Sequence, residues 1–184
     1  VLSPAYNWSG FYVGAMGGAG WGSDTGSGGF GGGTVGYNWQ FPGSQFVFGI
    51  EVDAAGASIT DSFTEDVGGI LFTTDTKINA LGSVTGRVGY AMDAALIYAK
   101  GGYAWANNKA SISVLGQTFS DSQTHTGYTI GGGLEYMFTP NWSAKGEYMF
   151  TSLGSETYNL LGGPLDYGTI DLHTFKVGVN YHFR

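Results

Sequence analysis

Hydrophobic and polar residues alternate with a period of two along most of this chain. Residues 46–56 show the pattern: large apolar side chains lie on one face, and small or charged side chains lie on the other. The apolar face holds Phe46, Phe48, Ile50, Val52 and Ala54, and the opposite face holds Val47, Gly49, Glu51, Asp53 and Ala55. Such alternation is typical of β-strands with two unlike faces. Since no segment shows a 3.6-residue apolar stripe with helix caps, we predict an all-β fold.

Eight strands are predicted, and their connections alternate in length. The strands cover residues 9–21, 30–41, 45–59, 76–91, 95–107, 124–138, 142–152 and 170–183. Tight turns are expected at 42–44, 93–94 and 139–141, and long polar loops at 22–29, 60–75, 108–123 and 153–169. This is typical of an eight-stranded antiparallel up-and-down transmembrane β-barrel with short periplasmic turns and long extracellular loops. The even strand count places both termini in the periplasm, and the single barrel domain (1–184) begins with a periplasmic segment, 1–8.

Composition indicates which face of the barrel meets lipid. Aromatic residues make up 16% of the chain and charged residues only 11%, whereas a soluble surface carries about 25–35% charged residues. A soluble barrel of the lipocalin type would have to hold the aromatic face inside, where eight strands leave little room. We therefore predict that the aromatic face meets lipid. The expected interfacial aromatics near the short turns are Trp39, Phe41, Phe46, Tyr90, Phe138, Trp142 and Phe183.

Eight charged residues fall on the opposite, glycine-rich face and are predicted to lie inside the barrel. They are Glu51, Asp53, Arg87, Lys100, Glu135, Lys145, Glu147 and Lys176, four acids and four bases. Strand order suggests that Glu51 lies beside Arg87 and Lys100 beside Glu135. Because buried charges must be paired, one interpretation is a structural ion-pair network that plugs the barrel. The other is a charged constriction in a narrow pore.

The remaining charges and the histidines suggest no further chemistry. The net charge of −7 comes from acids outside the predicted ladder, so a nucleic-acid partner is not expected. With no cysteine there is no disulfide, and the three histidines, His125, His173 and His182, have no metal-ligand spacing. We expect these histidines at the surface. Asp121, Ser122 and His125 are neighbours in a predicted flexible loop, which does not favour a catalytic triad. We predict no enzyme activity, metal or cofactor.

Several segments resemble one bacterial family. They are NWSGFYVG (7–14), GSVTGRVGY (82–90), GGGLEY (131–136), NW (141–142) and VGVNYHF (177–183). Together they resemble the small outer-membrane immunogenic proteins of alphaproteobacteria, also described as opacity-like or porin-family barrels and related to the barrel of outer membrane protein A. The resemblance implies secretion with a cleaved signal peptide and a barrel in the outer membrane of a Gram-negative bacterium. It also implies a C-terminal aromatic signal for the barrel-assembly machinery, here Tyr181 and Phe183, with Arg184 following.

These observations lead to one functional hypothesis and one alternative. The hypothesis is a non-enzymatic structural barrel that contributes to envelope integrity and presents acidic surface loops. Its expected partners are outer-membrane lipids, lipopolysaccharide and, during biogenesis, the assembly machinery. The alternative is a narrow low-conductance pore, or a surface protein that binds haemin or a host ligand through its loops.

Overall fold

Ten β-strands make up the regular structure of the described residues. The computed structural model describes residues 6–22, 26–67, 70–114, 117–154, 157–160, 163–166 and 170–183. The strands are β1 (Gly10–Gly22), β2 (Gly26–Gln40), β3 (Phe46–Val67), β4 (Ile70–Met92), β5 (Ala95–Val114), β6 (Gln117–Met137), β7 (Trp142–Leu153), β8 (Thr157–Leu160), β9 (Gly163–Asp166) and β10 (Ile170–His182). None of the described residues belongs to a helix long and apolar enough to span a membrane.

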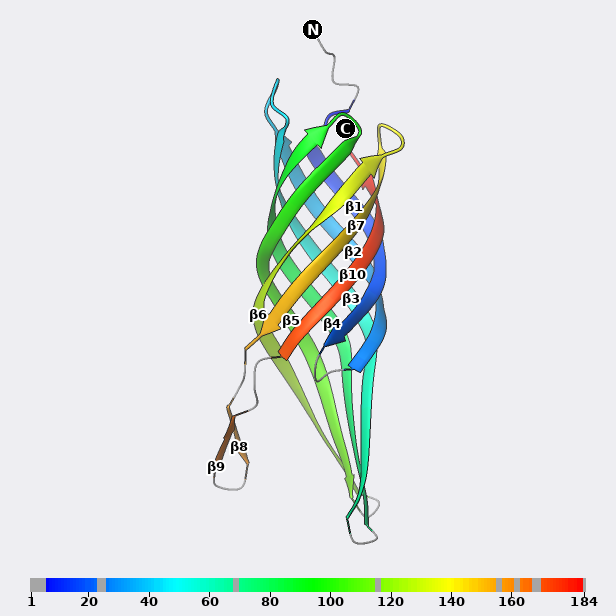
Figure 1. Ribbon diagram of the computed structural model, residues 1–184, viewed down its shortest axis with the longest axis vertical. Coiled ribbons are helices and arrows are strands. Elements are labelled where there is room, and N and C mark those ends of the chain that lie inside the picture. The colour runs from blue at the N-terminus through cyan, green and yellow to red at the C-terminus, as the bar shows by residue number, and fades with distance from the viewer. Residues whose placement is uncertain are drawn as a thin grey trace.

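Eight of these strands close into an antiparallel barrel in the order β1-β10-β7-β6-β5-β4-β3-β2 (Figure 1). Each barrel strand pairs with the next barrel strand along the chain, β7 with β10, and the seam is closed where β1 pairs with β10, with Tyr12 opposite His182. The short strands β8 and β9 form a separate hairpin between β7 and β10. The prediction of an eight-stranded up-and-down barrel is therefore confirmed.

The prediction of long loops was wrong at two places. Residues 60–67 and 70–75 continue β3 and β4, which stay paired to Val67 and Ile70, and β5 and β6 stay paired to Val114 and Gln117. The two hairpins extend well beyond the rest of the barrel wall (Figure 1). Their Ser, Thr and Asp content suggested loops, but a ladder needs only backbone hydrogen bonds, and β-branched Thr and Ile favour strands. Likewise, β1 and β2 take up most of 22–29, and β8 and β9 lie within 153–169.

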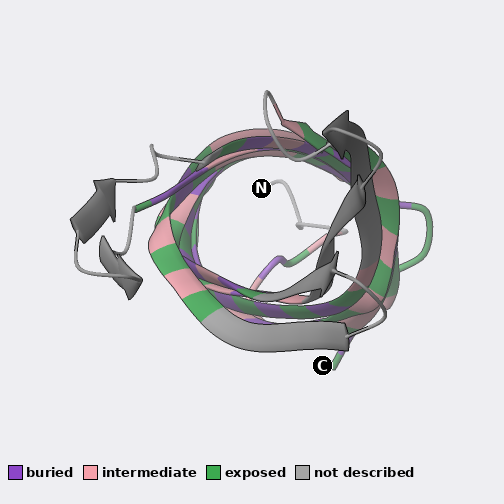
Figure 2. Cartoon of the chain, turned by 90° about the horizontal axis from the view of Figure 1, so that it is seen from below, coloured by how far each residue is buried: buried purple, intermediate pink, exposed green. Residues whose placement is uncertain are grey.

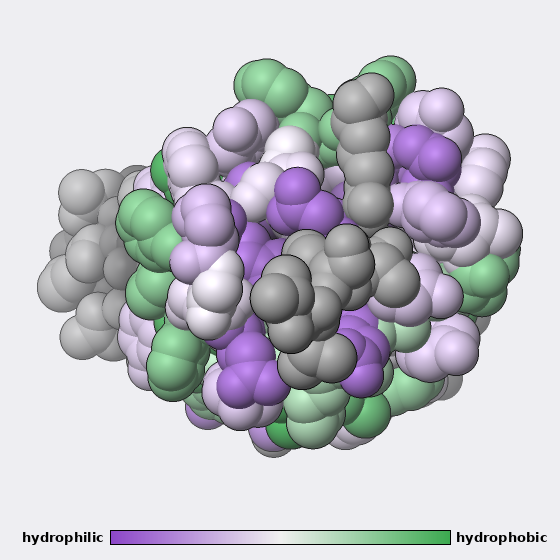
Figure 3. Space-filling model, turned by 90° about the horizontal axis from the view of Figure 1, so that it is seen from above, coloured by the Kyte–Doolittle hydropathy of each residue, from purple (hydrophilic) through white to green (hydrophobic). Residues whose placement is uncertain are grey.

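The two ends of the barrel differ. The chain ends and the three short turns lie at one end, and the long hairpins lie at the other (Figure 1). Gly43, with φ of 78°, and Asp93, with φ of 54°, supply the left-handed backbone that tight hairpin turns need. Seen onto the end with the termini, hydrophilic residues gather in the middle and hydrophobic residues lie around the edge (Figure 3).

Burial alternates along the strands, as the bands of colour in Figure 2 show. Large apolar side chains on the outer face are about half exposed, for example Val35 (53%), Ile130 (59%) and Val177 (54%). Side chains of the other parity are buried in the lumen. The apolar side chains therefore face outward, as the composition predicted.

Candidate functional site

Eight buried charged side chains fill the middle of the lumen. They are Glu51 and Asp53 on β3, Arg87 on β4, Lys100 on β5, Glu135 on β6, Lys145 and Glu147 on β7, and Lys176 on β10. Strand alternation explains the arrangement, since each of them has the parity that points inward. The sequence analysis selected the same eight residues, and the structure brings all of them together.

Arg87 organises the part of this network nearest the termini. Its guanidinium lies 2.7 Å from Glu135 and 3.4 Å from Glu51, so it links two carboxylates. The Tyr12 hydroxyl donates to Glu51 at 2.7 Å and accepts a hydrogen bond from Arg87 at 3.1 Å. The guanidinium also lies over the Tyr98 ring, 4.1 Å from its centroid. Carboxylates thus neutralise the Arg87 guanidinium on one side, and its other side packs against the Tyr98 ring.

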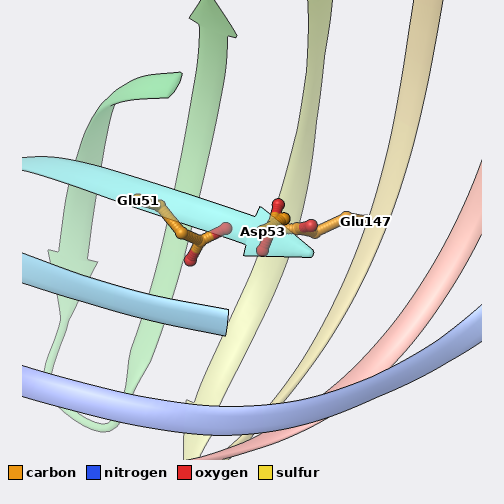
Figure 4. A group of neighbouring side chains, drawn as sticks. All are labelled: Glu51, Asp53 and Glu147. Carbon is orange, nitrogen blue, oxygen red and sulfur yellow. The ribbon is translucent and has the colours of Figure 1, made fainter. Parts of the chain in front are cut away.

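Lys100 lies among three carboxylates. Its ammonium group pairs with Glu51, with Asp53 at 3.1 Å and with Glu147 at 3.2 Å. Oxygens of these three acids lie within 4.8 Å of one another, which is the spacing of a metal site (Figure 4). The ammonium groups of Lys100, Lys145 and Lys176 already bind these oxygens. The cluster is therefore neutralised by the protein's own cations.

Two further lysines connect opposite walls of the barrel. Lys145 on β7 reaches Glu51 on β3 at 2.9 Å, and these strands are four positions apart in the ring of eight. Lys176 lies 2.6 Å from Asp53 and 2.8 Å from Glu147. Because the Lys145–Glu51 and Lys176–Asp53 pairs cross the lumen, they fill its cross-section at mid-height. The four acids and four bases sum to zero charge.

The pairing differs in part from the expected ladder. Glu51 does contact Arg87, but Glu135 is paired with Arg87, whereas Lys100 reaches across to Glu51, Asp53 and Glu147. The register explains the difference, because Arg87 and Lys100 lie directly opposite each other on β4 and β5. Like charges in that position repel, so each side chain turns toward carboxylates on other strands.

Sequence reasoning missed several lumenal partners of the network, among them Tyr12, Tyr98 and His182. Tyr98 donates to Glu147 at 2.5 Å. His182, expected at the surface, is 3% exposed, and its Nε2 lies 2.9 Å from the Ser143 hydroxyl and 3.4 Å from Glu135. The sequence signal that could have found them is the alternation along each strand, which places these residues on the inward face.

A second signal marks Tyr12, because a glycine lies directly opposite it. Gly36 on β2 pairs with Tyr12 on β1, and a Cβ at Gly36 would overlap the Tyr12 ring. The glycine therefore makes room for an aromatic side chain that points inward, against the general pattern of this chain.

An apolar cluster closes the lumen at the end with the termini. Trp8 is fully buried and packs with Val47, Ala91, Leu96, Tyr98 and Met137. Its indole N–H donates to the Asp93 carbonyl at 3.3 Å, and its backbone N–H donates to the Gln40 side chain at 3.0 Å. Trp8 belongs to the segment predicted to precede the barrel, and the structure places it inside the barrel mouth.

A small cavity lies on the other side of the charged network. It has a volume of about 70 Å³, with Asp53 and Lys176 among its lining residues. Met16, Leu81 and Leu172 are among its apolar wall residues. Since about 10–15 Å³ of such volume is enough for one water molecule, the cavity has room for several water molecules.

The predicted interfacial aromatics all lie on the outer face. Between 38% and 65% of each of these aromatic residues is exposed; they are Trp39, Phe41, Phe46, Tyr90, Phe138, Trp142 and Phe183. Tyr181, the other predicted assembly-signal residue, is partly exposed and packs on Trp142, with ring centroids 5.1 Å apart. The backbone N–H of Phe183 donates to the Phe11 carbonyl at 2.9 Å, which ties the end of the chain to β1.

A second group of exposed aromatics, which the sequence analysis did not single out, lies toward the long hairpins. It includes Trp21, Tyr103, Tyr128, Tyr148 and Phe175. On β1, Phe11 and Trp21 are ten residues apart, which corresponds to about 25 Å along the axis of a barrel with strands tilted by roughly 40°. This separation matches the height of the apolar band of an outer-membrane barrel.

The remaining candidate groups from the sequence lie in regular strands. Asp121, Ser122 and His125 lie in β6, a strand, and not in a flexible loop as expected. His125 has the inward parity of its strand, whereas His173 lies on the outer face beside Tyr148. These two histidines therefore lie on opposite faces of the wall.

Comparison with known proteins assigns the family. Residues 3–183 match the family model of the outer membrane protein β-barrel domain. The chain belongs to this outer-membrane β-barrel family. It is 36% identical over 168 residues to the 31 kDa outer-membrane immunogenic protein of Brucella melitensis, an alignment that covers 87% of this chain and 69% of that protein. It is also 37% identical over 186 residues to the 22 kDa outer membrane protein of Rhizobium leguminosarum, and this alignment covers 99% of this chain and 81% of that protein.

Solved barrels share the fold of this outer-membrane protein at low sequence identity. The attachment invasion locus protein Ail of Yersinia pestis superposes with a TM-score of 0.56 at 19% identity, covering 95% of this chain and 97% of that one. Neisserial surface protein A gives a TM-score of 0.56 at 17% identity, and the superposition covers 95% of this chain and 98% of that one. The half-exposed apolar band is thus the surface in contact with outer-membrane lipid.

Proposed function

We propose that this outer-membrane protein is a non-enzymatic structural barrel, closed to ions, that contributes to envelope integrity. The observation that carries the proposal is the neutral network of eight charges, whose pairs join opposite walls of the lumen. A continuous water path would require several of these buried pairs to separate together, and each separation leaves charges in a low-dielectric interior. The Trp8 cluster is a second, apolar barrier in series with the first.

The proposed orientation has both termini in the periplasm and the long hairpins outside the cell. Ten of the fourteen acidic residues lie outside the lumen network, and eight of those lie in the segments first expected as loops. The hairpin end is therefore expected to present an acidic surface. The names of the Brucella relatives include the word immunogenic, which agrees with a surface that antibodies can reach. Lipopolysaccharide around the wall and the assembly machinery during biogenesis are the proposed partners.

Conductance in planar lipid bilayers tests whether the barrel is closed. We expect no steady open state from the refolded wild-type protein, and none from Trp8→Ala, because the charged network remains. A persistent open state of the wild type, with an ion selectivity that Lys100→Ala or Glu135→Ala changes, would contradict the proposal and support a narrow pore.

A deletion strain tests the role in the envelope. Loss of the gene should increase permeability to detergents and large hydrophobic antibiotics, and the wild-type gene should restore the barrier. A matched variant replaces residues 61–76 with an Asn-Gly turn, since Thr60 and Lys77 are paired at that point. This variant keeps the wall, so it should also restore the barrier. Restoration by the wild type alone would instead assign the function to the hairpin.

A further inference from the structure

One imidazole lies on the lipid-facing wall of the barrel. His173 on β10 is flanked in sequence by Leu172 and Thr174, which are buried in the lumen, so its side chain points outward. In the sheet register it lies directly opposite Trp21 on β1 and Phe150 on β7. A polar ring among exposed aromatic side chains is unusual on a surface that meets hydrocarbon.

The neighbours of His173 hold its ring in place. Trp21 stacks on it, with centroids 6.2 Å apart and planes 15° apart, and Phe150 lies 5.2 Å away. The Tyr148 hydroxyl lies 2.5 Å from Nδ1. When this hydroxyl donates to Nδ1, the imidazole proton is on Nε2, and Nε2–H remains available as a donor to a group outside the wall.

The position of His173 along the barrel axis indicates which group outside the wall can accept this hydrogen bond. Eight residues of β10 separate His173 from Tyr181 at the other aromatic band, about 20 Å along the axis at a tilt near 40°. The ring is thus at the edge of the apolar band on the side of the long hairpins. Lipid headgroups occupy this level, and amphipathic rings such as Trp21 and Tyr148 are favoured there.

The geometry points to a lipid-binding site formed by Trp21, Tyr148, Phe150 and His173, whose ligand is a phosphorylated glycolipid of the adjacent leaflet. His173 Nε2–H donates to a phosphate oxygen, and Tyr148 is the positioning residue that holds the proton on Nε2. The aromatic rings pack against the apolar part of the headgroup region. The assignment of this leaflet to the outside of the cell, and with it the choice of a glycolipid, rests on the proposed function.

Histidine NMR in lipid nanodiscs tests the site. The barrel carries three histidines, labelled with ¹⁵N, and the bilayer is phosphatidylcholine alone or doped with diphosphoryl lipid A or phosphatidylglycerol. Lipid A should shift the His173 Nε2 resonance and leave the lumenal His182 unchanged. Tyr148→Phe should alter the tautomer ratio of His173 and reduce the shift. Because lipid A is present in both leaflets of the nanodisc, the result does not depend on which end of the barrel faces the outside of the cell.

Lipid retention gives the quantitative test. We expect His173→Phe, which keeps the aromatic bulk, to retain lipid A about tenfold more weakly after transfer to detergent, as loss of a hydrogen bond to a charged group implies. Tyr181→Phe at the other band is the matched control and should retain it normally. Folding of each variant is verified by its heat-dependent electrophoretic mobility. Equal retention by His173→Phe, or no NMR shift, would overturn the site, and an equal response to phosphatidylglycerol would overturn the glycolipid assignment. Bilayer conductance is unaffected by either outcome.

Discussion

Replacing Arg87 with Met tests how much the lumenal network stabilises the barrel. The side chain is buried, and its removal takes one cation from Glu135 (2.7 Å) and Glu51 (3.4 Å). Breaking a buried pair costs about 3–5 kcal/mol. Glu135 keeps hydrogen bonds from Ser143 at 2.5 Å and Asn180 at 2.8 Å. We therefore expect the lower end of that range, about 3 kcal/mol.

Urea titrations of the barrel in lipid vesicles, followed by tryptophan fluorescence and electrophoretic mobility, measure this loss. Arg87→Lys keeps the charge but not the fork that reaches two carboxylates, so a smaller loss of about 1–2 kcal/mol is expected. A double-mutant cycle with Glu135→Gln should give a coupling energy of about 2 kcal/mol. A loss below about 1 kcal/mol for Arg87→Met, with no coupling to Glu135, would show that water screens the network and would refute the reasoning.

Four further substitutions, one of them a control, probe other parts of the barrel by the same titration. Val177→Arg, midway between the aromatic bands on the lipid face, should cost about 2–4 kcal/mol, and no cost would mean that this face does not meet lipid. Gly36→Ala should cost about 1–3 kcal/mol because its Cβ overlaps the Tyr12 ring. Gly146→Ala, with no atom within 4 Å of the new Cβ, should be nearly neutral, and equal costs at both glycines would contradict the steric argument. Trp8→Ala should cost about 3–5 kcal/mol, and a neutral result would remove the apolar barrier from the description.

The period of two carried most of what could be predicted about the fold. Alternation assigns each residue to one of two faces, and the composition of those faces shows which one meets lipid. It therefore led to the eight strands, to the lumenal position of residues such as Glu51 and Lys176, and to the outward position of Trp142. The long β3–β4 and β5–β6 hairpins were missed because their polar, Thr-rich sequences are equally typical of loops.

The partners within the lumen could not be derived in the same way. The period-two alternation predicts that Lys145 points inward. Its contact with Glu51, however, depends on the stagger between strands around the whole barrel. The burial of Trp8 follows from the chain turning back across the mouth, held by contacts to Gln40 and Asp93 that are distant in sequence. No local pattern encodes such contacts.

The pairs that cross the lumen also bear on the order of events in folding. Lys145 and Glu51 are 94 residues apart in the chain, and Lys176 and Asp53 are 123 apart. Neither pair forms within a single hairpin, because each needs several strands in register before the two side chains meet. An unclosed sheet would therefore carry charges on one face without their partners from across the lumen, and that face is incompatible with hydrocarbon. Ring closure, charge neutralisation and loss of lumenal water then become a single late cooperative step, and contacts of such long range make that step intrinsically slow.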